Sequence, residues 1–204
     1  MTYDGLLFDY DGVIADTEPL HWKSWCAALE PHGIRLTWAD YCRYCRGIAY
    51  TSMRKPLENL NPAVARIADL EERYLEAKHA AFARLTDHPP IPAPTIAMLR
   101  ELRGVRAGLV TTAQCRSVEP VLRAAGIHDC FQAFVYRDDV VHPKPAPDAY
   151  RLGAERLGAS RILVFEDTNA GVESARAAGL DVVFVEECAR LPDLVARELY
   201  SRSR

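Results

Sequence analysis

Residues 5–12 read Gly5-Leu6-Leu7-Phe8-Asp9-Tyr10-Asp11-Gly12, an apolar run that ends in two carboxylates. The first four residues predict a buried strand, and Gly12 permits a sharp turn directly after it. Carboxylates two positions apart at the end of a strand can both face one cleft at the carboxyl edge of a sheet. Two negative charges held that close repel each other, so they indicate a bound cation or a shared proton, and a hard divalent metal ion is the obvious partner.

The composition is that of an ordinary globular protein. The chain has 204 residues and is 49% apolar, which suffices for one domain or for one domain with an insert. Its formal net charge of -3 gives no electrostatic footprint for nucleic acid or for an anionic membrane. No apolar run has the length of a bilayer, and Met1-Thr2-Tyr3-Asp4 leads into the first strand without a signal peptide, so we expect a cytoplasmic protein. The 6 cysteines are too sparse for a disulfide scaffold and predict reduced thiols.

Helical periodicity alone fills the segment from about Pro19 to about Leu85, which predicts several helices and no strand. The proline-dense residues 87–94 then predict a stiff, extended linker. We therefore expect an α-helical insert over residues 17–87, between the two parts of an α/β core at residues 1–16 and 88–204.

From Thr95 onward, helical and β-rich segments alternate. The predicted elements are helix 95–103, strand 105–110, helix 116–125, strand 132–136, helix 147–157, strand 161–165, helix 170–178 and strand 181–185. Such alternation predicts a Rossmann-like parallel sheet with helices on both faces, and the carboxyl ends of its strands should line the site.

Reactive side chains follow several of these predicted strands. Thr111 and Thr112 follow one strand, Glu166 and Asp167 follow another, and Lys144 lies in the loop after a third. A lysine and a hydroxyl beside a carboxylate cluster suit a phosphoryl group, whose spread negative charge needs donors and cations around it. The sequence has no GxxxxGK[ST] nucleotide loop, so we expect the phosphate to belong to the substrate rather than to bound ATP.

These residues resemble, in chain order, the four motifs of the haloacid dehalogenase superfamily. The matching residues are Asp9-Tyr10-Asp11-Gly12-Val13, then Thr111, then Lys144-Pro145-Ala146-Pro147-Asp148, then Glu166-Asp167 with Gly171-Val172. The resemblance spans the whole core and favours the phosphatase and phosphomutase branch, since dehalogenases lack the second aspartate of the first motif. It also implies that the helical insert is an α-helical cap of the first type.

By that resemblance, Asp9 is the nucleophile that becomes an aspartyl phosphate, and Asp11 is the general acid and base. Phosphoryl oxygens are bound by Thr111, Thr112 and Lys144, and the lysine also neutralises Asp9 before attack. The implied Mg²⁺ ligands are Asp9, the backbone carbonyl of Asp11, Asp167 and, either directly or one step outside the ion, Glu166.

Three residues of the insert are candidates for substrate contact, namely His21, Arg46 and Arg54. Arg46 and Gly47 resemble the substrate-facing loop of the cap. A histidine beside Trp22 is equally well explained as a packing residue, and Arg54 as a solvated helix charge.

The first function that follows is a Mg²⁺-dependent phosphatase of small phosphorylated metabolites, with sugar or polyol phosphates as the expected substrates. The small-molecule substrate is then the expected partner, and a monomer is the default because the sequence does not determine the oligomeric state. A phosphomutase of the β-phosphoglucomutase type shares every motif and is the alternative. A non-catalytic phosphate-binding regulator is disfavoured, because no catalytic position is lost.

Overall fold

The computed structural model describes residues 3–48 and 50–200, and it divides into two compact units. Met1–Asp16 and Thr86–Arg204 form one unit, here called the core unit, and Thr17–Leu85 form the other, here called the helical unit. Residues 1–2, 49 and 201–204 lie outside the described residues, and they include the first two residues of the stretch in which the sequence predicts no signal peptide.

The core unit is built on a parallel sheet of five strands in the described part of the chain, in the order β3-β2-β1-β4-β5. The strands are β1 (Gly5–Phe8), β2 (Arg106–Val110), β3 (Ala133–Val135), β4 (Ile162–Glu166) and β5 (Asp181–Phe184). In the centre, Leu7 pairs with Gly108 on one side and with Val164 on the other. Because all neighbouring strands are parallel, their carboxyl ends share one edge, and Asp9, Thr111 and Asp167 each come directly after a strand at that edge. The predicted α/β class with a parallel sheet is confirmed.

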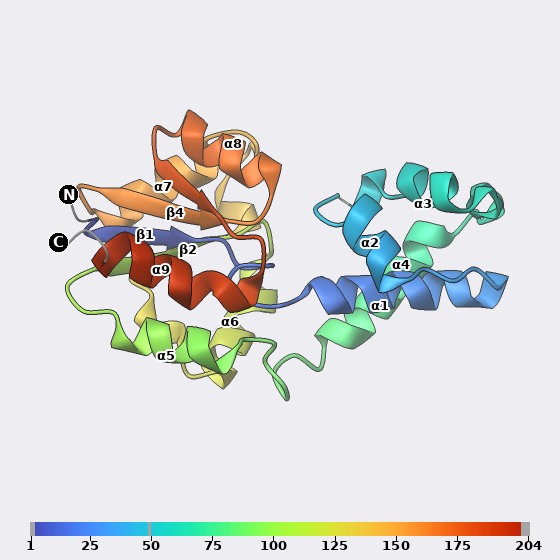
Figure 1. The fold of residues 1–204 in the computed structure, drawn as a ribbon, viewed down its shortest axis with the longest axis horizontal. Coiled ribbons are helices and arrows are strands. Elements are labelled where there is room, and N and C mark those ends of the chain that lie inside the picture. The colour runs from blue at the N-terminus through green and yellow to red at the C-terminus, as the bar shows by residue number, and fades with distance from the viewer. Residues whose placement is uncertain (1–2, 49, 201–204) are drawn as a thin grey trace. The chain divides into compact units, whose positions relative to one another are not determined.

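Helices cover both faces of this sheet (Figure 1). They are α5 (Ala93–Glu101), α6 (Cys115–Ala124), α7 (Asp148–Leu157), α8 (Asn169–Ala177) and α9 (Leu191–Tyr200). Helices α7 and α8 contact each other on one face, and α5 and α9 contact each other on the opposite face. Helix α5 begins two residues earlier than predicted, because proline fits the first turn of a helix, where its missing N–H is not needed.

Helix α7 approaches the sheet closely at Gly153. A Cβ on this glycine would lie 2.8 Å from Cγ2 of Val110, which is closer than real Cβ atoms come to other atoms. Because glycine has no side chain, α7 can pack closely against β2 at this position. One turn earlier, Tyr150 is fully buried in an apolar cluster that includes Leu7, Val110 and Val164.

The helical unit contains α1 (Glu18–Leu29), α2 (Trp38–Tyr44), α3 (Arg54–Leu60) and α4 (Leu70–Phe82), separated by short 3₁₀ turns. Helices α1 and α4 pack on each other, and the rings of Trp25 and Tyr74 stack with their centroids 4.0 Å apart. Among its described residues the unit has no strand, as the periodicity predicts. After α1 the chain turns at Gly33, which has a left-handed φ of 67°.

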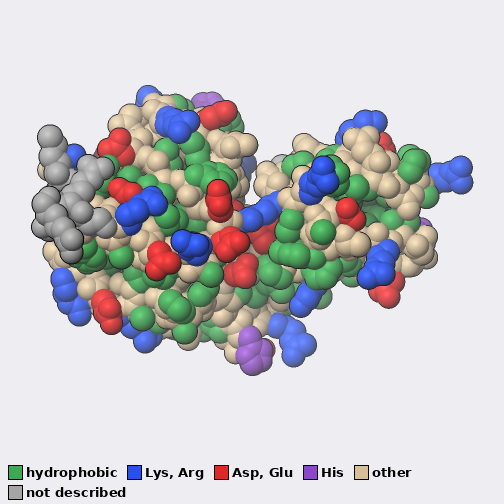
Figure 2. All heavy atoms as spheres, in the orientation of Figure 1, with side chains coloured by type: hydrophobic (Ala, Val, Ile, Leu, Met, Phe, Trp, Pro, Cys, Tyr) green, Lys and Arg blue, Asp and Glu red, His purple; other side chains and the backbone are tan. Residues whose placement is uncertain are grey.

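On the face shown in Figure 2, acidic and basic side chains are interspersed over the surface of each unit. This distribution agrees with the small net charge. None of the helices in the described ranges is both long enough and apolar enough to cross a bilayer. All six cysteines, which lie within those ranges, are free thiols.

Candidate active site

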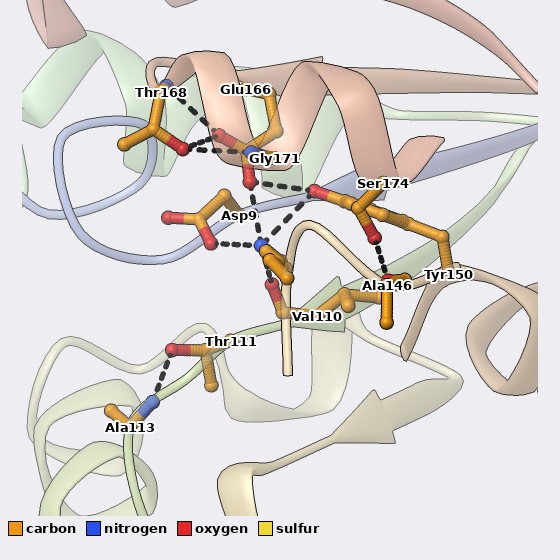
Figure 3. A network of polar contacts seen from close by, with 11 residues as sticks. Asp9, Val110, Thr111, Ala113, Ala146, Tyr150, Glu166, Thr168, Gly171 and Ser174 are labelled. Atoms are coloured by element: carbon orange, nitrogen blue, oxygen red, sulfur yellow. Dashed lines mark hydrogen bonds and ion pairs between the residues drawn. The ribbon is translucent and has the colours of Figure 1, made fainter. Parts of the chain in front are cut away.

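Three residues that are far apart in the sequence meet at the carboxyl edge of the central strands. Asp9 follows β1, Glu166 ends β4, and Lys144 comes from the loop over residues 140–147, here called the lysine loop. The Lys144 Nζ atom lies 2.5 Å from Asp9 Oδ1 and 2.6 Å from Glu166 Oε1. The lysine side chain is 5% exposed and the glutamate side chain 1%, so this is a buried ion pair that Asp9 shares. Figure 3 shows the network around these groups.

Both oxygens of Glu166 are occupied by hydrogen-bond donors. Oε1 accepts from Lys144 and, at 3.0 Å, from the hydroxyl of Tyr150. Oε2 accepts from the backbone N–H and from the hydroxyl of Thr168, both at 3.0 Å. Thr168 also caps helix α8 by accepting from the N–H of Gly171 at 3.0 Å. Each carboxylate oxygen thus has the two donors that its lone pairs can take.

The Lys144 ammonium faces more acceptors than it has protons. Besides the two carboxylates, Nζ lies 3.1 Å from the carbonyl oxygen of Val110 and 3.2 Å from the hydroxyl of Tyr150. An ammonium group has three N–H donors, so one of these four contacts must share a proton or give way.

The charges of this network follow from its contacts. Burial raises the pKa of Asp9 well above its ordinary value, and the neighbouring carboxylates of Glu166 and Asp167 raise it further, against the opposing effect of Lys144. Burial also works to raise the pKa of Glu166, but Lys144 and the donors of Thr168 outweigh it and lower that pKa. For Lys144, burial disfavours the charged form, yet the surrounding oxygens hold its pKa well above the ordinary value. Lys144 and Glu166 are therefore a charged pair at neutral pH.

Thr111 lies directly after β2, beside the carbonyl of Val110 that contacts Lys144. The threonine is buried, and its Oγ1 accepts from the N–H of Ala113 at 3.0 Å, which orders the start of the loop. Thr112, the next residue, is exposed on that loop. A hydroxyl and an exposed loop at the same edge of the sheet as Lys144 are suited to phosphoryl oxygens.

Gly12 follows Asp11 in the chain and lies against the side chain of Asp167. The glycine has a left-handed φ of 78°, and a Cβ on it would lie 2.0 Å from Asp167 Oδ2. The carboxylate of Asp167 thus lies directly against the turn that carries Asp11, and it is near enough to Asp9 to raise its pKa. This edge offers hard oxygen ligands from two carboxylates and a backbone carbonyl, the kind of set with which proteins hold Mg²⁺.

The metal ligand set implied by the resemblance, three carboxylates and the backbone carbonyl of Asp11, stays a prediction. Within residues 3–48 and 50–200, no group of three or more His, Cys, Asp and Glu side chains is arranged to hold a metal ion. The reason is Glu166, whose oxygens point at Lys144, Tyr150 and Thr168. The sequence left open whether Glu166 binds the metal ion directly or lies one step outside it, and the structure favours the position outside.

The three candidates in the helical unit each have contacts within that unit. The Nδ1 atom of His21 lies 2.7 Å from the hydroxyl of Tyr74. Arg54 pairs with Glu71 at 2.5 Å and donates to the carbonyl of Ile67 at 2.9 Å, and Arg46 is partly buried at the end of α2. Arg54 thus links α3 to α4, and the substrate roles of His21, Arg46 and Arg54 stay predictions.

Three residues that the sequence does not single out support the site, together with Gly171 of the last motif. Tyr150, Thr168 and Gly171 surround Glu166, and the buried hydroxyl of Ser174 donates at 2.5 Å to the carbonyl of Ala146 in the lysine loop. The only signal of the three in the sequence is a polar side chain within or just before a predicted helix. Such a signal does not identify a partner before the fold is known.

Comparison with known proteins agrees with this geometry. The family model for a haloacid dehalogenase-like hydrolase matches residues 3–179. The chain is 35% identical over 188 residues to the fructose-1-phosphate phosphatase YqaB of Escherichia coli (strain K12), an alignment that covers 90% of this chain and 96% of that protein. It is 28% identical over 183 residues to the phosphorylated carbohydrates phosphatase of Thermotoga maritima, covering 89% and 84% of the two chains. The crystal structure of CbbY from Rhodobacter sphaeroides in complex with phosphate superposes with a TM-score of 0.59 at 25% identity, over 90% of this chain and 86% of that chain.

Proposed function

Because this chain belongs to the haloacid dehalogenase-like hydrolases and is a phosphoric monoester hydrolase, we propose that it transfers the phosphoryl group of a small phosphorylated metabolite first to Asp9 and then to water. The observation that carries the proposal is the Lys144 ammonium, which lies 2.5 Å from Asp9 Oδ1 at the carboxyl end of β1. A cation so close to a buried carboxylate lets the carboxylate and an anionic phosphoryl group approach each other.

In the first half of the reaction, a carboxylate oxygen of Asp9 attacks phosphorus while the bond to the ester oxygen breaks. Asp11 gives its proton to the departing alkoxide. Lys144 offsets the charge on Asp9 and on the phosphoryl oxygens, and Thr111 donates to the same oxygens. In the second half, Asp11 takes a proton from water, the water oxygen attacks phosphorus, and Asp9 is released as a carboxylate with inorganic phosphate.

We assign Mg²⁺ to the carboxylates of Asp9 and Asp167 and to the backbone carbonyl of Asp11. Mg²⁺ is commonly held by one or two carboxylates with water and substrate phosphate, so this set is sufficient without Glu166. When bound, the ion would neutralise the charge that develops on the transferring group. Glu166 then binds the ammonium of Lys144, at 2.6 Å, and not the ion.

The proposed substrates are sugar or polyol phosphates. The relatives with the names fructose-1-phosphate phosphatase and phosphorylated carbohydrates phosphatase support this class, since both align over more than four fifths of their length. Selection among such substrates is assigned to the helical unit as a cap, with His21 and Arg46 as candidate contacts. The cytoplasmic location stays a prediction.

The test is a panel of phosphorylated compounds, including fructose 1-phosphate, a hexitol phosphate and p-nitrophenyl phosphate, assayed with and without Mg²⁺. We expect release of inorganic phosphate that needs Mg²⁺ and is abolished by Asp9→Asn. Asp138→Asn is the matched control, because Asp138 is an exposed aspartate outside the site. Turnover that survives Asp9→Asn would exclude the covalent route, and isomerised sugar phosphate in place of inorganic phosphate would assign a phosphomutase.

A further inference from the structure

Tyr150 is a buried polar residue that the proposed reaction does not use. It is the third residue of α7 and is fully buried, six positions after Lys144. Its ring lies in the apolar layer between α7 and the sheet, while its hydroxyl reaches the network around Glu166 (Figure 3). A phenylalanine would fill the same apolar space, so the hydroxyl needs an explanation of its own.

The hydroxyl contacts both members of the buried ion pair. It donates to Glu166 Oε1 at 3.0 Å and accepts from Lys144 Nζ at 3.2 Å, which is one donation and one acceptance, as a single O–H allows. The ammonium also lies over the face of the ring, 4.7 Å from its centroid. Tyr150 thus touches the lysine with both its hydroxyl and its ring.

A lysine needs such support more than most side chains do. Its ammonium is a compact charge on a flexible four-carbon stem with three rotatable donors. The backbone that carries Lys144 belongs to a loop, and Glu166 is a partner on only one side of the ammonium. Tyr150, Glu166 and Lys144 each contact the other two. The tyrosine hydroxyl therefore restrains Glu166 Oε1, and this oxygen in turn restrains the Lys144 ammonium.

We propose that Tyr150 is a positioning residue, which holds the Lys144 ammonium in place against Asp9 and the phosphoryl group. It acts through Lys144 and Glu166 and does not contact the substrate. This inference rests on the proposed function, because it assigns to the tyrosine a part in the same phosphoryl transfer.

The test compares Tyr150→Phe with the wild type in kcat, in KM for p-nitrophenyl phosphate and in thermal stability. The charge that Lys144 offsets grows in the transition state, so a loosened ammonium lowers kcat more than it weakens substrate binding. We expect kcat to fall about tenfold, as for the loss of one hydrogen bond to a charged group, while KM stays within about twofold. The matched control is Tyr3→Phe, which removes a hydroxyl that donates to Asp181 at 2.9 Å beside the amino ends of β1 and β5, at the opposite edge of the sheet, and should leave both constants unchanged.

A second measurement is independent of turnover. The ¹⁵N–¹H signal of the Lys144 ammonium should be observable in the wild type and in Tyr3→Phe, because a buried and hydrogen-bonded ammonium exchanges slowly with water. In Tyr150→Phe this signal should shift or broaden.

The results that would overturn the inference are distinct from those that would overturn the function. Unchanged kcat in Tyr150→Phe would overturn the inference, and so would an unfolded variant or a lower melting temperature with normal turnover per folded molecule, since the hydroxyl would then serve the fold alone. A rise in KM with unchanged kcat would also overturn it. Activity that survives both Asp9→Asn and Lys144→Ala would instead refute the proposed function.

Discussion

Replacing Gly171 by alanine tests how firmly Glu166 is fixed. Gly171 is the third residue of α8, and a Cβ at this position would lie 1.9 Å from both the carboxyl carbon and Oε1 of Glu166. Real Cβ atoms do not come so close, so the carboxylate must move. Its movement breaks contacts with Lys144 and Thr168 that the structure holds at 2.6 to 3.0 Å.

The cost can be worked out from those contacts. Hydrogen bonds to a charged group are worth about 1.5–3 kcal/mol each, and disrupting one partner of a buried ion pair costs about 3–5 kcal/mol. Alanine in place of glycine returns about 0.5–1 kcal/mol of helix preference. We therefore expect Gly171→Ala to lower the free energy of unfolding by about 2–4 kcal/mol, a large part of the about 5–15 kcal/mol typical of a domain, and to lower kcat at least tenfold.

Urea unfolding and phosphatase assays measure the two effects. Gly179→Ala is the control at the other end of the same helix, since Gly179 has a left-handed φ of 79° but open space where its Cβ would lie. It should lose only the about 1–2 kcal/mol of a strained backbone and keep full turnover. The losses of Gly171→Ala and Glu166→Ala should not add in the double variant, because the clash disappears with the glutamate. A Gly171→Ala protein with wild-type stability and turnover would refute the argument that Glu166 is fixed.

Three further predictions concern other parts of the molecule. Ser174→Ala removes the donor to the lysine loop and should cost about 1–3 kcal/mol in urea unfolding, and an unchanged midpoint would contradict the anchoring role. The hydrogen bonds from Arg54 lower the pKa of Glu71 below its unfolded value of about 4.3, so the pair stabilises the protein above that pH and loses its effect as pH falls through the folded pKa. Glu71→Gln should therefore melt below the wild type at pH 7, and the difference should shrink as the pH is lowered below about 4.3, whereas a difference that does not change with pH would exclude the ion pair as the cause. Gly12→Ala must displace Asp167 and should raise the Mg²⁺ concentration for half-maximal activity about tenfold or more, whereas an unchanged Mg²⁺ titration would remove Asp167 from the ligand set.

Much of the core unit is predictable because its signals are local. The predicted strands at 105–110 and 132–136 correspond to Arg106–Val110 and Ala133–Val135, since short apolar runs between turn residues mark buried strands. The convergence of Asp9, Lys144 and Glu166 is predictable as well, because parallel strands place their following residues at one edge.

The partners of Glu166 could not be predicted in the same way. The sequence places it next to Asp167 and so suggests a shared ion, but adjacent residues at the end of a strand point in opposite directions. Whether Glu166 or Asp167 points toward Lys144 depends on the path of the lysine loop and on how closely α7 approaches the sheet. Both are set by contacts between distant segments. The contacts of Tyr150 could not be predicted either, because hydrophobic periodicity predicts the burial of its ring but not the partner of its hydroxyl.

The central position of β1 has a consequence for the order in which the protein is made. Residue 5 pairs with residues 106 and 162, so this strand is synthesised long before either of its neighbours. The whole of Thr17–Leu85 is synthesised in between, and its helices contact one another. A nascent chain that ends before residue 106 therefore carries an apolar strand with both edges unpaired, and that interval is when it depends most on protection from aggregation.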